Sequence, residues 1–178
     1  MGCNKAVEHF DCDYLVFFDH GNFMHGGKYE TTCDTFKGKG GIYAPRPLDA
    51  AKERKDTHYI KKINGLQCDK QGIYCGNNSG VTALSVAVAL GYKRIYLLGM
   101  DARFSDTEKT HFHDGYTVKN NTDRMFESFA THFNMLGGYI QTTRPDVRVF
   151  NCSKISTVDP ERKYFKRMHI SRALYGNG

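Results

Sequence analysis

The sequence predicts an α/β fold of the Rossmann-like, three-layer type with a mainly parallel sheet. In the second half of the chain, strand, helix, strand, helix and strand patterns follow one another, which is the order that builds parallel sheets. The run RIYLL at 94–98 is almost continuously apolar, as expected of a strand whose two faces are both covered. The length of 178 residues suits one domain over 1–178 with a basic tail at 159–178.

The first half of the chain predicts short strands separated by loops. An apolar run at 13–19 ends in an acidic residue and indicates a buried strand. A brief strand is expected at 42–43, inside a segment rich in glycine, lysine and proline. Residues 49–56 predict an exposed helical turn. Two extended runs flank an Asn-Gly turn at 64–65, and this pattern predicts a hairpin.

The second half predicts two longer helices. The first begins at Asn78 or Ser79, which can cap its N-terminus, and runs to about Leu90, where Gly91 ends it. Its apolar positions at helical spacing are Ala83, Val86, Ala87 and Leu90.

The other long helix is expected over 122–139, because its apolar residues recur every three or four positions. A strand follows over 147–153, and a short helix is expected in the tail. The predicted core stripe of the long helix is Phe126, Phe129, Phe133, Leu136 and Ile140.

Composition narrows the class of protein. No apolar run approaches the roughly 20 residues that a membrane span needs, and the N-terminus lacks the apolar core of a signal peptide. We therefore expect no membrane span and a cytoplasmic location. The six cysteines form no regular framework and are expected to be reduced thiols. The net charge of +6 favours anionic partners such as nucleotides, phosphates or nucleic acid.

Three segments are expected to meet at the carboxyl edge of the sheet, where open α/β sheets bind ligands. They are Asp19 to Gly21 after the first strand, Asn77 to Gly80 at a helix start, and Gly99 to Asp101 after the next strand. Free N–H groups at a helix N-terminus favour an anion, and Gly80 lets a ligand approach the backbone. Asn78 and Ser79 can donate to a phosphate or a ribose. The alternative is a capped helix that holds no ligand.

The segment SGVTALSVAVALGYKRIYLLGMD, at 79–101, resembles the centre of the bacterial family 42 sialyltransferases. It is also similar to the Rossmann-like domain of motility accessory factors (Maf proteins) and archaeal 6-hydroxymethylpterin diphosphokinases, and to phage relatives of unknown role. The opening GCNKAVEHFDCDYLVFFD resembles the second motif of these proteins, and the Thr-His pair at 110–111 is closer to the motility factors. The resemblance implies a nucleotide-binding fold that takes a CMP-linked sugar.

The resemblance also implies site residues. Asn4, Asp19, Ser79 and Gly80 fall where the sialyltransferases contact the nucleotide, and Gly99 and Asp101 close the same edge. Two positions depart from the pattern: Gly76 stands where the family has an arginine, and Arg103 stands where it has a tyrosine.

The family's first strand and its Gly-x-Gly-Pro-Ser loop are missing ahead of Asn4, so a bare strand edge is expected beside 13–19. A second copy of the chain, forming a homodimer, is expected to cover that edge. The alternative cover is the tail, through Tyr164, Phe165, Met168 and Ile170.

The polar loop at 102–121 contains the candidate acid–base groups. His111 and His113 point the same way on an extended segment, and with Asp101 they can hold a divalent metal, or His111 can act as a general base. The alternative is a surface loop with incidental histidines. Arg103 suits bidentate phosphate binding, and its alternative is a surface ion pair.

Three functions remain open. The leading one is a nucleotide-dependent, glycosyltransferase-like transferase with a CMP-sugar donor of the sialic or nonulosonic acid type. A Mg²⁺-dependent diphosphokinase is the second, and a non-catalytic binder of nucleotides or sugar phosphates, such as a viral accessory protein, is the third. The expected partner is a nucleotide or nucleotide-sugar. The clusters at 52–55 and 163–172 are expected to be solvated basic faces, with nucleic acid a minor alternative because Tyr164 and Phe165 interleave with the second cluster.

Overall fold

The computed structural model describes residues 1–19, 29–46, 53–103 and 123–176 of the chain. It divides into two compact units, Met1–Gly91 and Tyr92–Gly178. Each unit mixes helices with strands, and the sheets are mainly parallel, so the predicted α/β class is confirmed. The sequence predicted one domain, whereas the contacts group the chain into two units.

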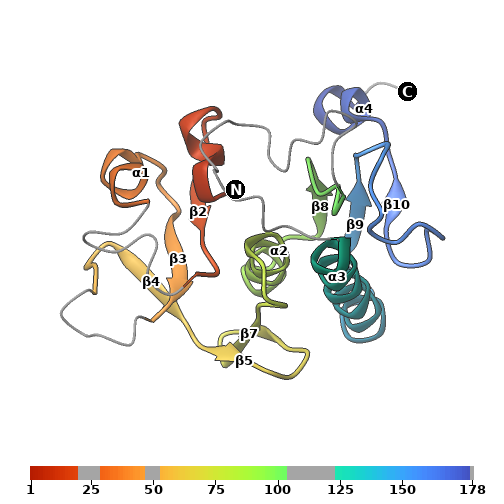
Figure 1. Cartoon of the computed structure of the whole chain (residues 1–178), viewed down its shortest axis with the longest axis horizontal. Helices are drawn as coiled ribbons and strands as arrows, with labels where there is room; N and C mark the ends of the chain where they lie inside the picture. The colour runs from red at the N-terminus through yellow and green to blue at the C-terminus, as the bar shows by residue number, and fades with distance from the viewer. Residues whose placement is uncertain (20–28, 47–52, 104–122, 177–178) are drawn as a thin grey trace. The chain divides into compact units, whose positions relative to one another are not determined.

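The main sheet of the first unit has four parallel strands in the order β1-β2-β3-β4, and β2, β3 and β4 can be followed side by side in Figure 1. Leu15 lies opposite Ile42 in the register, and both side chains are buried, which confirms strands at both predicted positions. The bounds are β1 Gly2–Cys3, β2 Tyr14–Val16, β3 Gly41–Pro45 and β4 Thr57–Ile60.

Strand β2 has a partner on each side, contrary to the bare edge expected beside it. Gly2 and Cys3 pair in parallel with Leu15 and Val16, and β3 occupies the other side. No unpaired edge therefore remains on β2. The tail strand β10 (Lys166–Arg167) pairs in parallel with β9 (Arg148–Asn151) of its own unit.

Helical segments follow β1 and precede β3. The 3-10 helix η1 (Asn4–Glu8) begins directly after β1, and α1 (Glu30–Thr35) begins after Tyr29. The rings of Tyr29 and Phe17 stack with their centroids 5.4 Å apart, and both side chains are fully buried. This aromatic pair joins the end of β2 to the start of α1.

A small second sheet corrects the predicted hairpin. Strands β5 (Lys62–Ile63) and β7 (Gly72–Tyr74), which flank the Asn-Gly turn, are parallel. The antiparallel pair is β7 with β6 (Cys68–Asp69), and its turn lies at Lys70 and Gln71. The Asp69 carboxylate fixes that turn by accepting from the N–H groups of Gln71 (2.7 Å) and Gly72 (3.2 Å).

Helix α2 (Ser79–Ala89) begins and ends close to the predicted residues. Asn78 is its N-cap, and Gly91, with φ of +89°, follows it in the left-handed conformation. Ala83, Val86 and Ala87 are buried as predicted, but Leu90 is exposed. Leu90 is the C-cap residue, one position beyond the last residue of α2.

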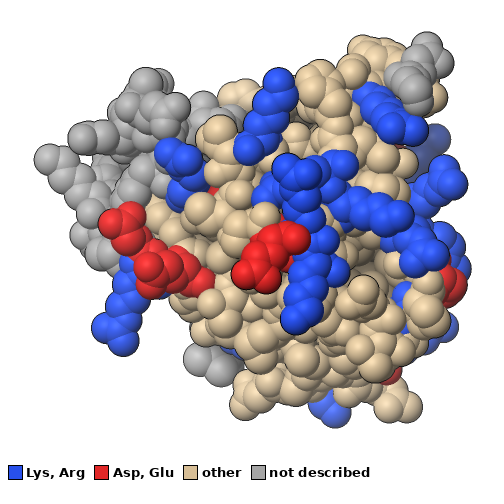
Figure 2. All heavy atoms as spheres, turned by 90° about the vertical axis from the view of Figure 1, so that its right-hand side faces the viewer, with Lys and Arg blue, Asp and Glu red and all other residues tan. Residues whose placement is uncertain are grey.

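The second unit has the parallel sheet β10-β9-β8, where β8 is Arg94–Leu97. Helix α3 (Asp123–Thr143) precedes β9, and α4 (Ile170–Tyr175) ends the described chain, which confirms the second long helix, the strand at 147–153 and the short tail helix. Of the predicted stripe on α3, four residues are buried and Phe129 is half-buried. Lys and Arg atoms spread over the β10–α4 side of this unit in Figure 2.

Residues 49–52 of the predicted helical turn lie outside the described residues, and 53–56 form no helix. Among the helices that the structure describes, none has the length and apolar character needed to span a bilayer.

Candidate functional site

The candidate site in the first unit lies where β1 and β2 end and α2 begins. The Ser79 hydroxyl donates to Asn4 Oδ1 at 3.1 Å and accepts from the Phe18 N–H at 3.1 Å. Ser79 is 8% exposed, so both bonds are screened from bulk water. One side chain thus ties the first residue after β1 to the segment after β2 and to the start of a helix.

Cys3 supports the same junction from the strand side. Its Sγ donates to the Ser79 carbonyl at 3.4 Å, and burial raises the pKa of the Cys3 thiol to about 12. The thiol therefore stays protonated at neutral pH, as a donor must. Asn4 adopts φ of +51°, in the left-handed region that asparagine tolerates better than most residues. This conformation turns the chain from β1 into η1.

Asn78 serves its own helix. Its Oδ1 accepts from the Val81 N–H at 2.8 Å, and its Nδ2 donates to the Gly76 carbonyl at 3.2 Å. These bonds account for the N-cap, and they leave Ser79 and Gly80 as the first two helical N–H groups, which have no intrahelical acceptor in an α-helix. The positive end of the helix dipole lies at the same place and favours an anion.

Asp19 follows Phe18 directly and is half-buried. It is the last described residue before 20–28, and its neighbours His20 and Gly21 lie outside the described residues. Five predicted site residues belong to the first unit: Asn4, Asp19, Asn78, Ser79 and Gly80. The side chains of Asn4, Asn78 and Ser79 make the hydrogen bonds described above.

The remaining predicted residues belong to the second unit, where β8 ends. Gly99 adopts φ of +67°, and Asp101 is half-buried. The Asp101 carboxylate accepts a hydrogen bond from Ser153 Oγ, just past the end of β9, and its carbonyl accepts from the Thr157 N–H at 2.9 Å. Asp101 therefore lies at the carboxyl edge of its own sheet, as predicted.

The candidate acid–base histidines, His111 and His113, lie outside the described residues, and so does the rest of 104–122. Arg103 is the last described residue before them and is exposed. Within the part of the chain that the structure describes, no three His, Cys, Asp or Glu side chains gather as a metal site. Asp101 is thus the one weak metal candidate whose surroundings can be described.

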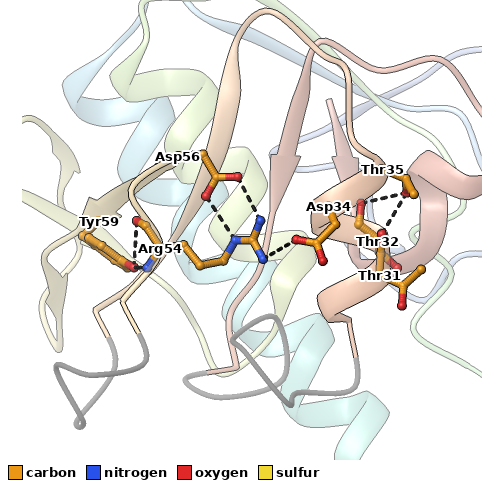
Figure 3. A network of polar contacts seen from close by, with 7 residues as sticks. All are labelled: Thr31, Thr32, Asp34, Thr35, Arg54, Asp56 and Tyr59. Atoms are coloured by element: carbon orange, nitrogen blue, oxygen red, sulfur yellow. Dashed lines mark hydrogen bonds and ion pairs between the residues drawn. The ribbon is translucent and has the colours of Figure 1, made fainter.

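Sequence reasoning missed a buried arginine in the first unit (Figure 3). Arg54 was expected on a solvated face, but its side chain is 7% exposed. Its guanidinium binds Asp56 through two bonds of 3.1 and 2.9 Å, and Nη1 makes an ion-pair contact with Asp34 at 2.7 Å that lacks hydrogen-bond geometry. The phenol of Tyr59 bonds the Arg54 backbone at both its N–H and its carbonyl.

The pKa values of Asp56 and Cys33, which lie close to Arg54, depart from their ordinary values. Hydrogen bonds from Arg54 hold the pKa of Asp56 below its ordinary value. Burial raises the pKa of the nearby Cys33 thiol to about 12, so this cysteine is unreactive at neutral pH. The cluster lies before β4 and on α1, at the amino ends of β3 and β4, and we assign it a structural role.

The basic tail of the second unit also contains side-chain hydrogen bonds that the sequence does not predict. Arg167 donates to the carbonyls of Ser153 (2.8 Å), Ser156 (3.0 Å) and Val158 (3.0 Å). The buried Asp159 accepts from the N–H groups of Lys163, Tyr164 and Phe165. These two side chains fix the segment between β9 and β10. The sequence does not predict these contacts, because Arg167 and Asp159 bind backbone groups and not side chains of opposite charge.

A hollow of about 390 Å³ opens in the first unit at the amino ends of β2 and β3. Asp11, Asp13, Lys37 and Lys39 line it together with the ring of Phe36. Because both charges are present, the lining favours neither anions nor cations. Parallel α/β sheets bind ligands at the opposite, carboxyl edge, where Ser79 lies.

No protein-family model matches the chain, and neither a curated protein nor a solved structure is significantly similar to it. The class of protein therefore follows from the fold alone, which is α/β with mainly parallel sheets.

Proposed function

We propose that the chain is a nucleotide-dependent, glycosyltransferase-like transferase that takes a CMP-linked sugar of the sialic or nonulosonic acid type. The observation that supports this proposal best is the Ser79 hydroxyl, bonded at once to Asn4 and to the Phe18 N–H. This junction lies at the carboxyl ends of two adjacent parallel strands and at the first turn of a helix. Nucleotides bind at such junctions in α/β folds.

The proposal gives each residue a distinct role. The N–H groups of Ser79 and Gly80 bind the phosphate, and Gly80, without a Cβ, leaves room for it. Asn4 and Asp19 contact the cytidine, while Asn78 holds the helix start in place. Gly99, Arg103 and the acid–base candidates Asp101, His111 and His113 all belong to the second unit. Their part in nucleotide binding or in acid–base chemistry stays a prediction from the sequence.

Titration calorimetry with CMP, CDP and cytidine tests the site. We expect CMP to bind wild-type protein more tightly than cytidine, because only CMP carries the phosphate. Gly80→Val should lose CMP binding while staying folded by circular dichroism. The matched control is Gly65→Val, since a Cβ at Gly65 meets open space. Equal CMP affinity in folded Gly80→Val and wild type would reject the site.

A second candidate is Mg²⁺-dependent diphosphoryl transfer, and Asp101 is the observation in its favour. A half-buried carboxylate at the end of β8 is the type of ligand that Mg²⁺ prefers. Under this candidate, Mg²⁺ or Mn²⁺ should raise the melting temperature, because a ligand that binds only the native state stabilises it. Absence of a shift, with and without nucleotide, removes this candidate.

Turnover separates an enzyme from a plain binder. In the absence of an acceptor, water takes the sugar: wild-type protein should hydrolyse CMP-sialic acid to CMP and free sialic acid in excess of the uncatalysed rate, and Asp101→Asn and His111→Ala should lower that rate. Tight CMP binding without any release from the donor would instead favour the non-catalytic binder of nucleotides or sugar phosphates.

A further inference from the structure

The tail of the second unit concentrates positive charge. Between residues 152 and 178 there are six Lys and Arg but only two acidic residues, Asp159 and Glu161. The Asp159 carboxylate is buried against backbone N–H groups, and Arg167 is held by three carbonyls. The exposed cations, which we call the basic face, are Lys154, Arg162, Lys163, Lys166 and Arg172.

The segments that bear these cations are held next to one another. Arg167, in β10, bonds the carbonyls on either side of the loop that contains Lys154. The Met168 N–H bonds the Asn151 carbonyl at 3.2 Å, which keeps the start of the tail helix beside the end of β9. Figure 2 looks onto this side of the unit, where Lys and Arg atoms predominate over acidic ones.

Apolar side chains stand exposed on the same segments. Ile155 is 45% exposed, Ile170 43%, Leu174 61% and Tyr175 72%. Ile170 and Leu174 are four residues apart on α4 and therefore lie on one face of that helix. Basic residues interspersed with aliphatic ones are the composition of surfaces that bind the interface of an anionic bilayer.

The structure favours lipid over nucleic acid as the occupant. Binding of single-stranded nucleic acid relies on exposed aromatic rings that stack on bases. Phe165 is 1% exposed, and Tyr164 is half-buried with the Lys163 ammonium 5.4 Å from its ring centroid. The side chains that do project are mostly aliphatic, and the exposed Tyr175 is a residue type found at the headgroup level.

We propose that the basic face, together with Ile155, Ile170, Leu174 and Tyr175, docks the protein on an anionic lipid surface. Lysine and arginine side chains contact the headgroups, and the aliphatic residues enter the boundary with the acyl chains. The binding is peripheral and reversible, and it uses none of the residues that are assigned to nucleotide binding or catalysis.

Flotation of the full chain with large unilamellar vesicles tests the proposal. We expect binding to vesicles of phosphatidylcholine with 30% phosphatidylserine, and little to phosphatidylcholine alone. Binding should weaken as salt rises, because screening shortens the range of the attraction. The variant Lys154→Gln/Lys166→Gln should bind about twenty-five-fold more weakly, since each basic residue near such a surface contributes about fivefold.

Two control variants make the same kinds of substitution at other exposed positions of the chain. Lys55→Gln/Lys70→Gln removes the same charge from exposed positions of the first unit and should bind like wild type. Ile170→Ser/Leu174→Ser should weaken binding severalfold, whereas Leu90→Ser, also at an exposed leucine, should not. Circular dichroism checks that every variant is folded.

Several results would overturn the proposal. One is equal binding to neutral and anionic vesicles. Another is wild-type vesicle binding by the double-serine variant, because the aliphatic residues would then play no part. A third is tight binding to a labelled oligonucleotide with no binding to either kind of vesicle, which would make the basic face a nucleic-acid site.

Discussion

The Ser79 hydroxyl joins two segments that are more than sixty residues away from it in the sequence. It donates to Asn4 and accepts from the Phe18 N–H, and it is nearly buried. A buried donor that loses its partner bears the cost of its own desolvation, which is larger than the net value of the bond. Removal of the Ser79 hydroxyl oxygen alone should therefore destabilise the fold.

Ser79→Ala should lower the free energy of unfolding by about 1–3 kcal/mol, because the Phe18 N–H and Asn4 Oδ1 both lose their partner. Urea unfolding followed by circular dichroism measures this change. Ser128→Ala, at an exposed position of α3, is the control and should cost less than about 0.5 kcal/mol. An equal cost for the two variants would show that the junction contributes nothing to stability.

Arg54 shows what residue-level reading misses. The run of charges around it looks like a solvated face, and its burial depends on Asp34, twenty residues earlier in the chain. No local sequence pattern predicts the ion pair between Arg54 and Asp34. Asp56 is close in sequence, but the spacing alone does not say whether the pair is buried or exposed.

The lowered pKa of Asp56 predicts a dependence on pH. A carboxyl group whose folded pKa lies below its unfolded value stabilises the fold above the unfolded pKa, about 3.9 for aspartate. This stabilisation is lost as pH falls through the folded pKa. Between pH 5 and pH 2, wild type should therefore lose more stability than Asp56→Asn, as measured by urea midpoints. Parallel curves for the two proteins would contradict the assignment.

Among the elements, those with local signals were predicted best. Asn78 and Gly91 bracket α2 by cap chemistry that depends only on neighbouring residues. The hairpin was misplaced because the Asn-Gly dipeptide at 64–65 does not join neighbouring antiparallel strands. The strand before it pairs in parallel with β7, and such non-local pairing has no signature within the turn.

The two central glycines of α3 form a matched pair. A Cβ on Gly137 would lie 2.7 Å from Tyr164 Cβ and 2.8 Å from the Phe165 ring, whereas one on Gly138 would meet Tyr164 at 3.5 Å, an ordinary contact. Gly137→Ala should lower the free energy of unfolding by about 1–3 kcal/mol through overpacking. Gly138→Ala should raise it by about 0.5–1 kcal/mol, since alanine favours helix.

Thermal or urea unfolding of the two alanine variants, side by side, checks this prediction. Stabilisation by both would mean that helix propensity outweighs packing, and that α3 does not approach the 164–165 segment as closely as described.

At the scale of the whole molecule, the sequence predicted the class of fold and the position of several candidate site residues at the carboxyl ends of strands. Asn4, Asp19 and the start of α2 do lie at the carboxyl ends of β1 and β2, and Asp101 lies at the carboxyl end of β8. It did not predict that these residues divide between two compact units. This division depends on how extensively residues before position 92 contact residues after position 91. Hydrophobic periodicity along the sequence does not predict such contacts.

We propose that the junction at Ser79 binds the phosphate of a nucleotide. Amide chemical shifts of ¹⁵N-labelled wild-type protein, recorded as CMP is added, test this claim without any mutation. We expect the resonances of Asn4, Ser79 and Gly80 to move together and to saturate. No change at these three residues at millimolar CMP, or changes confined to 92–176, would contradict the account.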